Sequence, residues 1–458
     1  MNALIFSALS GVIMMFSGIL LKQNSSIRTV AHVLLLAVIA VNILELRGVS
    51  IFDINTRGMM VFDRFSLLFT LVLNVCTLVF FLLSSREMEK VGVNYADYFA
   101  LIFFILVGGV LVASFKSLLI LFLGIEILSI PLYILTGSDK RNLKSNEAAL
   151  KYFLMGSFST GIMLMGIALV YGATATFSTA DMRIAADNIP VLFIAGMMML
   201  LFAMSFKVSA APFHFWTPDV YDGAPTVFTS FMATVVKAAF FVGFLRLFND
   251  AFGDVQTEWK LLVGIITGLT LFIGNITAVF QKSVKRMLAY SSIAQAGFMM
   301  LAVFALTADA AEGLLLYAAA YSLATIGIFS VLVKMPDYTF DGFNGFARQQ
   351  PLIAALVTIL LLSLAGIPLT AGFLSKFYML KATVANGNLW LAIFAVIMAA
   401  VSVYYYFRLI QAMYFKDGDD QQPVIHISSG FKYTLVGVAV VTILLGIFPN
   451  ILTHWLYF

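Results

Sequence analysis

Long apolar segments follow one another along almost the whole chain, separated by short polar connections. Many approach or exceed the roughly 20 residues that an α-helix needs to cross the hydrocarbon core of a bilayer. Of the 458 residues, 62% are hydrophobic and only 11% are charged, which leaves too few polar side chains to cover a water-soluble globule. We therefore expect an all-α polytopic membrane protein, because a helix satisfies its own backbone hydrogen bonds within lipid.

The apolar segments predict about fourteen transmembrane helices. The expected spans are 3–21, 29–46, 65–84, 97–113, 117–137, 147–171, 191–211, 226–247, 261–280, 287–306, 311–335, 352–380, 388–414 and 431–456. The first lacks the basic start and the small-residue cleavage site of a signal peptide, so we expect it to remain as a helix. Between the second and third spans, the β-like residues 50–62 surround a turn signal at 55–58 and predict a small extramembrane hairpin.

Two of the long apolar segments contain residues that interrupt a helix. The seventh ends at Pro212, and the twelfth contains Gly366 and Pro368. Proline removes a backbone hydrogen bond and clashes with the preceding turn, and the freed carbonyl groups need a polar interior. The breaks lie five helices apart. This spacing predicts two five-helix repeats, each with a broken helix, and the odd helix count predicts that the repeats are inverted.

The repeats divide the chain into four parts. Residues 1–96 would hold the first three helices and the hairpin, residues 97–247 and 248–414 the two repeats, and residues 415–458 a loop and the last helix. An even number of spans places both termini on one side of the membrane. The connections on the other side are richer in lysine and arginine, so the positive-inside rule places the termini on the non-cytoplasmic side.

Four lysines lie within the apolar segments, where a charged side chain costs free energy unless it faces a polar interior. They are Lys151, Lys207, Lys237 and Lys376, and Glu126 is the acidic residue expected near the middle of its span. Charged residues in such positions mark paths for ions or protons. Lysine suits proton transfer because desolvation disfavours its charged form. The set therefore predicts a proton path through the membrane.

Several of these residues also have structural explanations. Glu126 could be a neutral acid bonded to a neighbouring helix, and Lys376 could extend to the lipid headgroups. Lys151 follows Glu147 by one helical turn, an order that favours a plain ion pair. His214, beside the first helix break, could pass protons between the break and solvent or could simply pack in a turn.

The sequence lacks the signatures of a redox centre or a metal site. Its one cysteine, Cys76, excludes an intrachain disulfide and a cysteine-held iron–sulfur cluster. Neither a phosphate-binding glycine loop nor a metal-ligand spacing is present, and no basic tract alternates with aromatic residues as in nucleic-acid binders. We therefore expect the lipid bilayer as surroundings, no nucleic acid as a partner, and no metal or other cofactor in this chain.

Five segments resemble the antiporter-like membrane subunits of NADH–quinone oxidoreductase, respiratory complex I. They are LFLGIEILSIPLYILTG, SNEAALKYFLMGSFSTGIMLMGIALVYGAT, FKVSAAPFHFWTPDVYDGAPT, VKRMLAYSSIAQAGFM and LAGIPLTAGFLSKFYMLKA. The resemblance covers about residues 60–415. The EAALKYF stretch and the short chain resemble chain N more than the related chains L and M.

The resemblance implies a central hydrophilic axis in which Glu126 lies beside Lys207, followed by Lys237 and Lys376, with Lys151 near the first pair. It also implies a bacterial inner membrane, chains M and L and small membrane chains as partners, and NADH, FMN, iron–sulfur clusters and quinone in or between other subunits. Gln295 occupies a place where some relatives have histidine, so a titrating group there is not implied.

Three functions are compatible with these residues. The first is proton export driven by NADH–quinone electron transfer in other subunits, which the resemblance favours. The alternative is a subunit of a multi-subunit cation/proton antiporter, which would share the lysines and the broken helices but would not depend on NADH oxidation. A passive assembly subunit is the third, and the presence of all five family charges counts against it.

Overall fold

The computed structural model describes residues 1–458 except 53, 183–188, 419–426 and 457–458. The described residues form helices and connecting turns, and the only strand-like pairings among them are isolated bridges. Within this part of the chain, 12 helices are long and apolar enough to cross a membrane, and Val191–Lys207 and Pro351–Ala365 are shorter apolar helices. The predicted all-α polytopic membrane fold is therefore confirmed.

The helix bounds follow the apolar segments to within a few residues in most cases. The helices are α1 (Asn2–Leu20), α2 (Asn24–Leu46), α3 (Arg64–Met88), α4 (Tyr95–Ser114), α5 (Leu118–Thr136), α6 (Leu143–Thr174), α7 (Val191–Lys207), α8 (Trp216–Gly223), α9 (Thr226–Phe231), α10 (Lys237–Asp250), α11 (Gln256–Val279), α12 (Val284–Ala305), α13 (Ala308–Leu332), α14 (Phe346–Gln349), α15 (Pro351–Ala365), α16 (Ala371–Ala385), α17 (Leu389–Phe415), α18 (Ser429–Ile447) and α19 (Asn450–Thr453). A π-helical turn, η1 (Met232–Val236), joins α9 to α10 in one continuous run.

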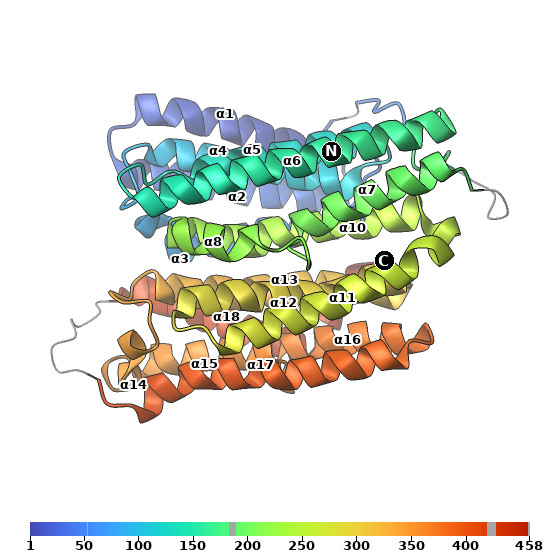
Figure 1. The fold of residues 1–458 in the computed structure, drawn as a ribbon. Helices are drawn as coiled ribbons and strands as arrows, with labels where there is room; N and C mark the ends of the chain where they lie inside the picture. Colours follow the sequence, from blue (N-terminus) through green and yellow to red (C-terminus); the bar gives the residue numbers. More distant parts are fainter. Residues whose placement is uncertain (53, 183–188, 419–426, 457–458) are drawn as a thin grey trace.

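The helices form two groups that lie side by side (Figure 1). The blue-to-green helices α1–α10 make one group, and the yellow-to-red helices α11–α18 make the other. Contacts of α8 and α10 with α12, and of α3 with α13, join the groups. The most apolar 18 residues of the run α9–α10 and of α13 are all buried, whereas only 28% of the corresponding residues of α2 are buried. The centre of the bundle is thus enclosed by protein, and outer helices such as α2 present an apolar face to lipid.

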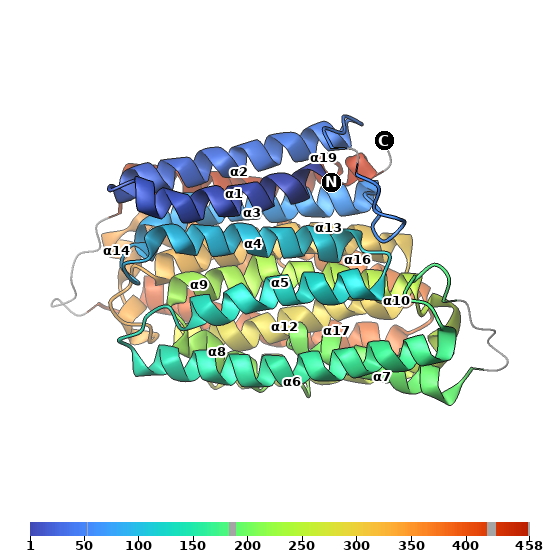
Figure 2. The ribbon, with the colours of Figure 1, turned by 90° about the horizontal axis from the view of Figure 1, so that it is seen from above.

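Both ends of the described chain lie at one end of the bundle (Figure 2). The amino group of Met1 pairs with Glu45 at the end of α2, and Glu45 and Trp455 line the same cavity. This agrees with an even number of membrane crossings. The predicted hairpin over residues 50–62 is wrong in its pairing. A turn does form at Arg57 and Gly58, but Met60 makes an antiparallel bridge with Phe115 in the α4–α5 connection.

Two further expectations differ from the structure. The segment after Pro212, expected as a loop, contains the helix α8, in which Pro218 occupies the first turn and so loses no intrahelical hydrogen bond. The last span was expected to reach residue 456, but α18 ends at Ile447, two residues before Pro449, because the residue preceding a proline disfavours the helical conformation. Residues 419–426 of the expected C-terminal loop lie outside the described residues.

Candidate functional site

Three of the predicted lysines are buried in the centre of the bundle on three different helices. Lys207 ends α7, Lys237 begins α10, and Lys376 lies in α16; their exposed fractions are 5%, 2% and 5%. Burial of a charged side chain is costly unless polar groups surround it. The partners of each ammonium group therefore decide what this line of lysines, called here the lysine axis, is able to do.

Lys207 and Glu126 face each other across α7 and α5. The Lys207 Nζ lies 4.0 Å from Glu126 Oε1 and donates a hydrogen bond of 3.0 Å to Ser129 Oγ, one turn further along α5. The same Glu126 oxygen accepts a hydrogen bond of 2.7 Å from Thr160 Oγ1 on α6. The pair is thus close enough for a strong charge interaction but lacks a direct hydrogen bond, so a small movement of either side chain would change the interaction.

The helix interruption after Lys207 is held in place by bonds to other elements. The indole nitrogen of Trp216 donates to the Phe206 carbonyl at 3.1 Å, and the Ala211 amide donates to Thr270 Oγ1 on α11 at 2.8 Å. Ser209, which lies between Phe206 and Ala211, has a φ of 66°, a left-handed backbone conformation that residues other than glycine normally avoid. The break is therefore a built feature that ends α7 at the lysine.

Several buried polar atoms around this break have no protein partner within the described residues. They include the Ser205 and Ser209 hydroxyls and Nδ1 of His214, and His214 itself is 5% exposed. Buried groups of this kind are usually satisfied by ordered water. The structure thus places the predicted access residue His214 inside the break, with its ring 4.6 Å from that of Phe215, and the surroundings are suited to water.

Among the described residues, Lys237 has only neutral partners. Its Nζ donates to the backbone carbonyl and to the hydroxyl of Ser292 on α12, both at 3.0 Å, and lies 5.7 Å from the centre of the Tyr221 ring. The residue follows directly on the π-helical turn η1, a distortion that is found frequently at functional sites. The ammonium is thus stabilised by dipoles and an aromatic face, without an opposite charge in contact.

Lys376 uses the carbonyl groups that the second helix break sets free. Gly366 has a φ of 87° and ends α15, and the Lys376 Nζ donates to the Leu364 and Ala365 carbonyls at 2.7 Å and 3.1 Å. The ring of Phe298 lies 4.5 Å from the same nitrogen. The alternative in which Lys376 reaches the headgroups is therefore wrong, because its ammonium is turned into the bundle.

The contact between Gly366 and Lys376 predicts a sensitive position. A Cβ at residue 366 would lie 3.0 Å from Lys376 Cδ, and the backbone there is left-handed. We expect Gly366→Ala to destabilise the break by about 1 kcal/mol or more and to displace the lysine, which would lower proton translocation. The amount of assembled protein and its proton translocation should be measured together. Gly430→Ala, where a Cβ would meet nothing within 4 Å, is the control, and wild-type translocation in Gly366→Ala would contradict the prediction.

Lys151 does not join the lysine axis. Its side chain is 44% exposed and pairs with Glu147 at 2.8 Å and with Asp219 of α8 at 3.3 Å. It is nine residues from Thr160 along α6, which corresponds to about 14 Å. The expected position near the Glu126–Lys207 pair is thus wrong, because Lys151 lies near the start of α6. It lines a cavity of about 160 Å³ together with Lys144, Asp222 and Arg286.

Two further basic residues, which the sequence analysis did not single out, are buried near the ends of helices. Lys285, 4% exposed, donates to the Asp222 and Ala224 carbonyls at 2.8 Å and 2.7 Å. Arg246 is buried at the opposite end of the bundle and pairs with Asp63 at 2.7 Å. Burial acts to raise the pKa of Asp63, but the hydrogen bond and charge of Arg246 prevail and lower it. Both basic residues lie near the ends of apolar segments, where sequence alone does not reveal an inward side chain.

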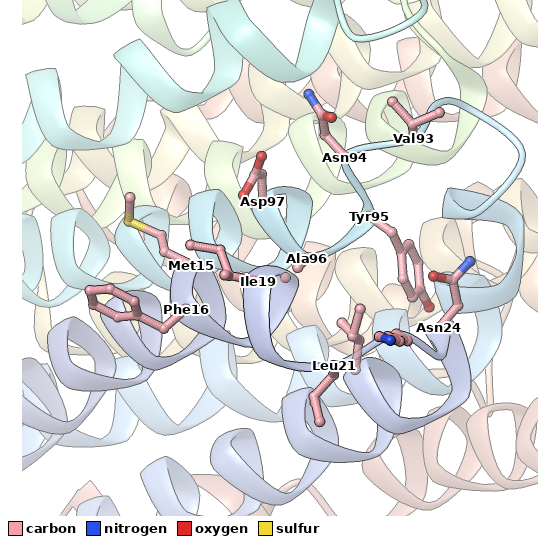
Figure 3. Close-up of a pocket in the computed structure, with 13 residues that line it drawn as sticks. Met15, Phe16, Ile19, Leu21, Asn24, Val93, Asn94, Tyr95, Ala96 and Asp97 are labelled. Carbon is pink, nitrogen blue, oxygen red and sulfur yellow. The ribbon is translucent and has the colours of Figure 1, made fainter.

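A large open cavity lies beside the turn between α1 and α2 (Figure 3). Its volume is about 740 Å³, and it is lined by the α1–α2 turn and the start of α4, including Phe16, Ile19, Lys22, Tyr95 and Asp97. None of the residues that line it belongs to the axis. Size therefore does not identify the functional site in this protein. Among the described residues, no three His, Cys, Asp or Glu side chains are grouped so that they could hold a metal ion.

The fold and the buried lysines define a class of membrane protein in which charged side chains line the interior of a helical bundle with interrupted helices. The chain belongs to the family described as "NADH:quinone oxidoreductase/Mrp antiporter, TM", which matches residues 116–402. Within it, the chain belongs to the subunit N group of NADH-quinone oxidoreductases. It is 42% identical to "NADH-quinone oxidoreductase subunit N" of Cytophaga hutchinsonii over 86% of this chain and 87% of that protein.

Solved structures share the same fold. A chain of "Respiratory complex I from Thermus thermophilus with bound Aureothin" matches with a TM-score of 0.85 and 30% identity, covering 99% of this chain and 98% of that one. A chain of "Structure of Mrp complex from Dietzia sp. DQ12-45-1b" matches with a TM-score of 0.87 and 18% identity, covering 99% of this chain and 96% of that one. At that identity the second match shows the fold alone.

Proposed function

We propose that this chain translocates protons as a membrane subunit of a bacterial NADH–quinone oxidoreductase, in which electron transfer takes place in other subunits. The observation that carries the proposal is the set of partners of the lysine axis. Lys237 and Lys376 contact only neutral oxygen atoms and aromatic rings, and Lys207 is 4.0 Å from its carboxylate. Each ammonium thus lacks a tight ion pair that would fix its proton.

In the proposed mechanism, Glu126 controls the proton of Lys207. Two unit charges 4 Å apart interact by about 4 kcal/mol at an effective dielectric constant of about 20. Moving one charge against 100 mV costs about 2.3 kcal/mol. The charge interaction that is lost when Glu126 separates from Lys207 exceeds this cost, so the separation can release the proton toward Lys237 and Lys376. In this proposal the redox subunits drive the movement.

The remaining parts of the path are assigned by their position, because Lys151 is exposed and its ion pairs with Glu147 and Asp219 distinguish it from the lysine axis. Lys151, in the charged cavity at the end of the bundle opposite the termini, would exchange protons with water, and His214 would provide access at the break marked by Pro212. The positive-inside rule places that end in the cytoplasm and both termini on the other side. The fourteen crossings would include two inverted five-helix repeats, residues 97–247 and 248–414, each with one break. Glu126 and Lys207 would lie in the first repeat and Lys376 in the second.

The proposed partners are the antiporter-like chains M and L and the small membrane chains of the same enzyme. NADH, FMN, the iron–sulfur clusters and quinone would bind in or between other subunits. The name of the Cytophaga hutchinsonii relative and the Thermus thermophilus match support this assignment. The description of the matching family also includes the Mrp antiporter. A cation/proton antiporter would share the fold, so the energy source distinguishes the two functions.

The charge of Glu126 is expected to be essential for coupling. Glu126→Gln keeps the size of the side chain and the acceptor for Thr160 Oγ1 but removes the charge that faces Lys207, so proton translocation should fall by about tenfold. Glu126→Asp keeps the charge and should be milder. NADH–quinone turnover and proton movement should be measured in the same membranes, with Glu89→Gln, a half-exposed partner of Arg28, as the control. Equal, wild-type activity of both Glu126 variants would show that the pair is only structural.

A further inference from the structure

A cluster of neutral polar side chains is buried between Lys237 and Lys376. Ser291, Ser292 and Gln295 lie on α12, Tyr317 lies on α13 and Tyr406 lies on α17, and none of the five is more than 2% exposed. Ser292 is the partner of Lys237, through both its carbonyl and its hydroxyl. The other four form one hydrogen-bonded group. The cluster thus extends from the residue that holds Lys237 toward the second helix break.

Gln295 connects this cluster to the site of Lys376. Its amide nitrogen donates to the Leu364 carbonyl at 2.9 Å and to the Tyr406 hydroxyl at 3.1 Å, and its amide oxygen accepts from the Tyr317 hydroxyl. The Leu364 carbonyl is also the acceptor of Lys376 Nζ at 2.7 Å. Gln295 and Lys376 therefore share one acceptor, so a chain of hydrogen bonds through the Leu364 carbonyl and Gln295 links the Lys376 site to the Tyr406 hydroxyl.

The contacts of Gln295 also fix the direction in which Tyr406 donates. A backbone carbonyl only accepts, so the NH₂ group of Gln295 must face Leu364, and the other N–H of that group points to Tyr406. The Tyr406 oxygen therefore accepts from Gln295, and its own hydrogen is directed to its second partner, the Ser291 hydroxyl. An amide neither gains nor loses a proton at physiological pH, so Gln295 orients the group without carrying the proton.

We propose that the Tyr406 hydroxyl, oriented by Gln295, is the relay through which a proton passes between Lys376 and Lys237. The inference rests on the proposed function and deepens it. In one passage the Ser291 oxygen accepts a proton from the Lys237 side and releases its own hydrogen to the Tyr406 oxygen. Tyr406 in turn releases its hydrogen toward neutral Lys376. Each hydroxyl gains and loses one proton, so no charge remains on the relay. The passage leaves the Tyr406 hydrogen directed to Ser291, the orientation that Gln295 sets, and rotation of the two hydroxyls prepares the next passage.

A buried tyrosine outside the hydrogen-bonded group provides the control. Tyr95, at the start of α4, is 2% exposed, and its hydroxyl donates to the Ser85 carbonyl of α3 at 2.9 Å. Tyr95→Phe and Tyr406→Phe each remove one buried hydroxyl. In the assembled enzyme we expect Tyr406→Phe to lower NADH-driven proton translocation by roughly tenfold, and Tyr95→Phe to leave it within about twofold of wild type.

A solvent isotope effect separates a relay from a structural role. Loss of the hydroxyl should make proton transfer limiting, so the ratio of the rates in H₂O and D₂O should rise in Tyr406→Phe and not in Tyr95→Phe. A second variant, Gln295→Met, keeps an unbranched side chain of similar length but no longer orients Tyr406, and it should show the same rise. Equal rates and unchanged isotope effects in the Tyr95 and Tyr406 variants would overturn the relay.

A further variant distinguishes an error in the relay from an error in the proposed function. Lys237→Ala should be measured in the same membranes. If Lys237→Ala abolishes proton translocation and Tyr406→Phe behaves as wild type, only the relay is overturned. If Lys237→Ala also translocates protons at the wild-type rate, the lysine axis itself does not carry them, and the relay is overturned with it.

Discussion

Replacing Lys207 by alanine is expected to reduce NADH-driven proton translocation to background while the protein still assembles. The substitution removes the ammonium that faces Glu126 at 4.0 Å and leaves the carboxylate bonded to Thr160, so it exposes no other cation. A loss of at least about tenfold corresponds to about 1.4 kcal/mol or more in the barrier of the coupled step. Arginine at this position tests which property of the lysine matters, because Arg keeps the charge but does not release its proton.

We therefore expect Lys207→Arg to be as inactive as Lys207→Ala. Proton movement and NADH–quinone turnover should be recorded in the same membrane vesicles, with the amount of assembled enzyme as the reference. Lys260→Ala is a suitable control, since its Nζ donates to Asn386 Oδ1 at 2.7 Å on the loop that follows α16 and contacts no residue of the lysine axis. Wild-type translocation by Lys207→Arg would show that only a fixed charge is needed, and by Lys207→Ala that the residue has no part in the path.

The fold follows from local features of the sequence, because the length of an apolar segment is sufficient to identify a membrane-crossing helix. Proline and glycine then mark the interruptions, since α7 ends five residues before Pro212 and α15 ends directly before Gly366. The error at residues 50–62 has a different origin. The turn is encoded locally, but the pairing of Met60 with Phe115 connects residues 55 positions apart, and a strand pattern does not name its partner.

The charged residues of the candidate site can be predicted from the sequence, but the atoms that they contact cannot. A lysine in an apolar segment is visible in the sequence, but the oxygen atoms that hold Lys237 and Lys376 come from backbone carbonyls and from Ser292. Any residue can supply a carbonyl, so such partners leave no signal. Lys285 and Arg246 were missed for a related reason, because at a helix end the direction of the side chain depends on tertiary packing.

The relay residues illustrate the same limit. Tyr405 and Tyr406 are adjacent members of a tyrosine run that predicts interfacial or packing residues, and nothing in the sequence separates them. Their hydroxyls nevertheless have different hydrogen-bond partners, Asn275 for Tyr405, and Ser291 and Gln295 for Tyr406. Successive residues of a helix differ in direction by about 100°, and the partners that each tyrosine meets depend on the helices packed around it.

The energy source of proton movement provides the last expected result. In liposomes that contain the assembled enzyme, a sodium gradient imposed without NADH should drive no proton movement, whereas NADH and quinone should drive it at once. The reason is that the oxygen atoms of this chain that could bind a cation already have other partners. Hard cations such as Ca²⁺ and Mg²⁺ are bound by several oxygen ligands that usually include carboxylates. Glu126 is engaged by Thr160 and Lys207, and the carbonyls freed at the second break are taken by Lys376.

A cation/proton antiporter would behave in the opposite way, because its second ion gradient alone drives the exchange. Internal pH should therefore be followed with a trapped dye, first after the sodium gradient is imposed and then after NADH is added. An ionophore that exchanges sodium for protons, added to a parallel sample, verifies that the gradient was present. Proton movement driven by sodium alone, and abolished by Lys207→Ala, would assign the lysine axis to cation exchange, because the lysines would then respond to an ion gradient and not to electron transfer.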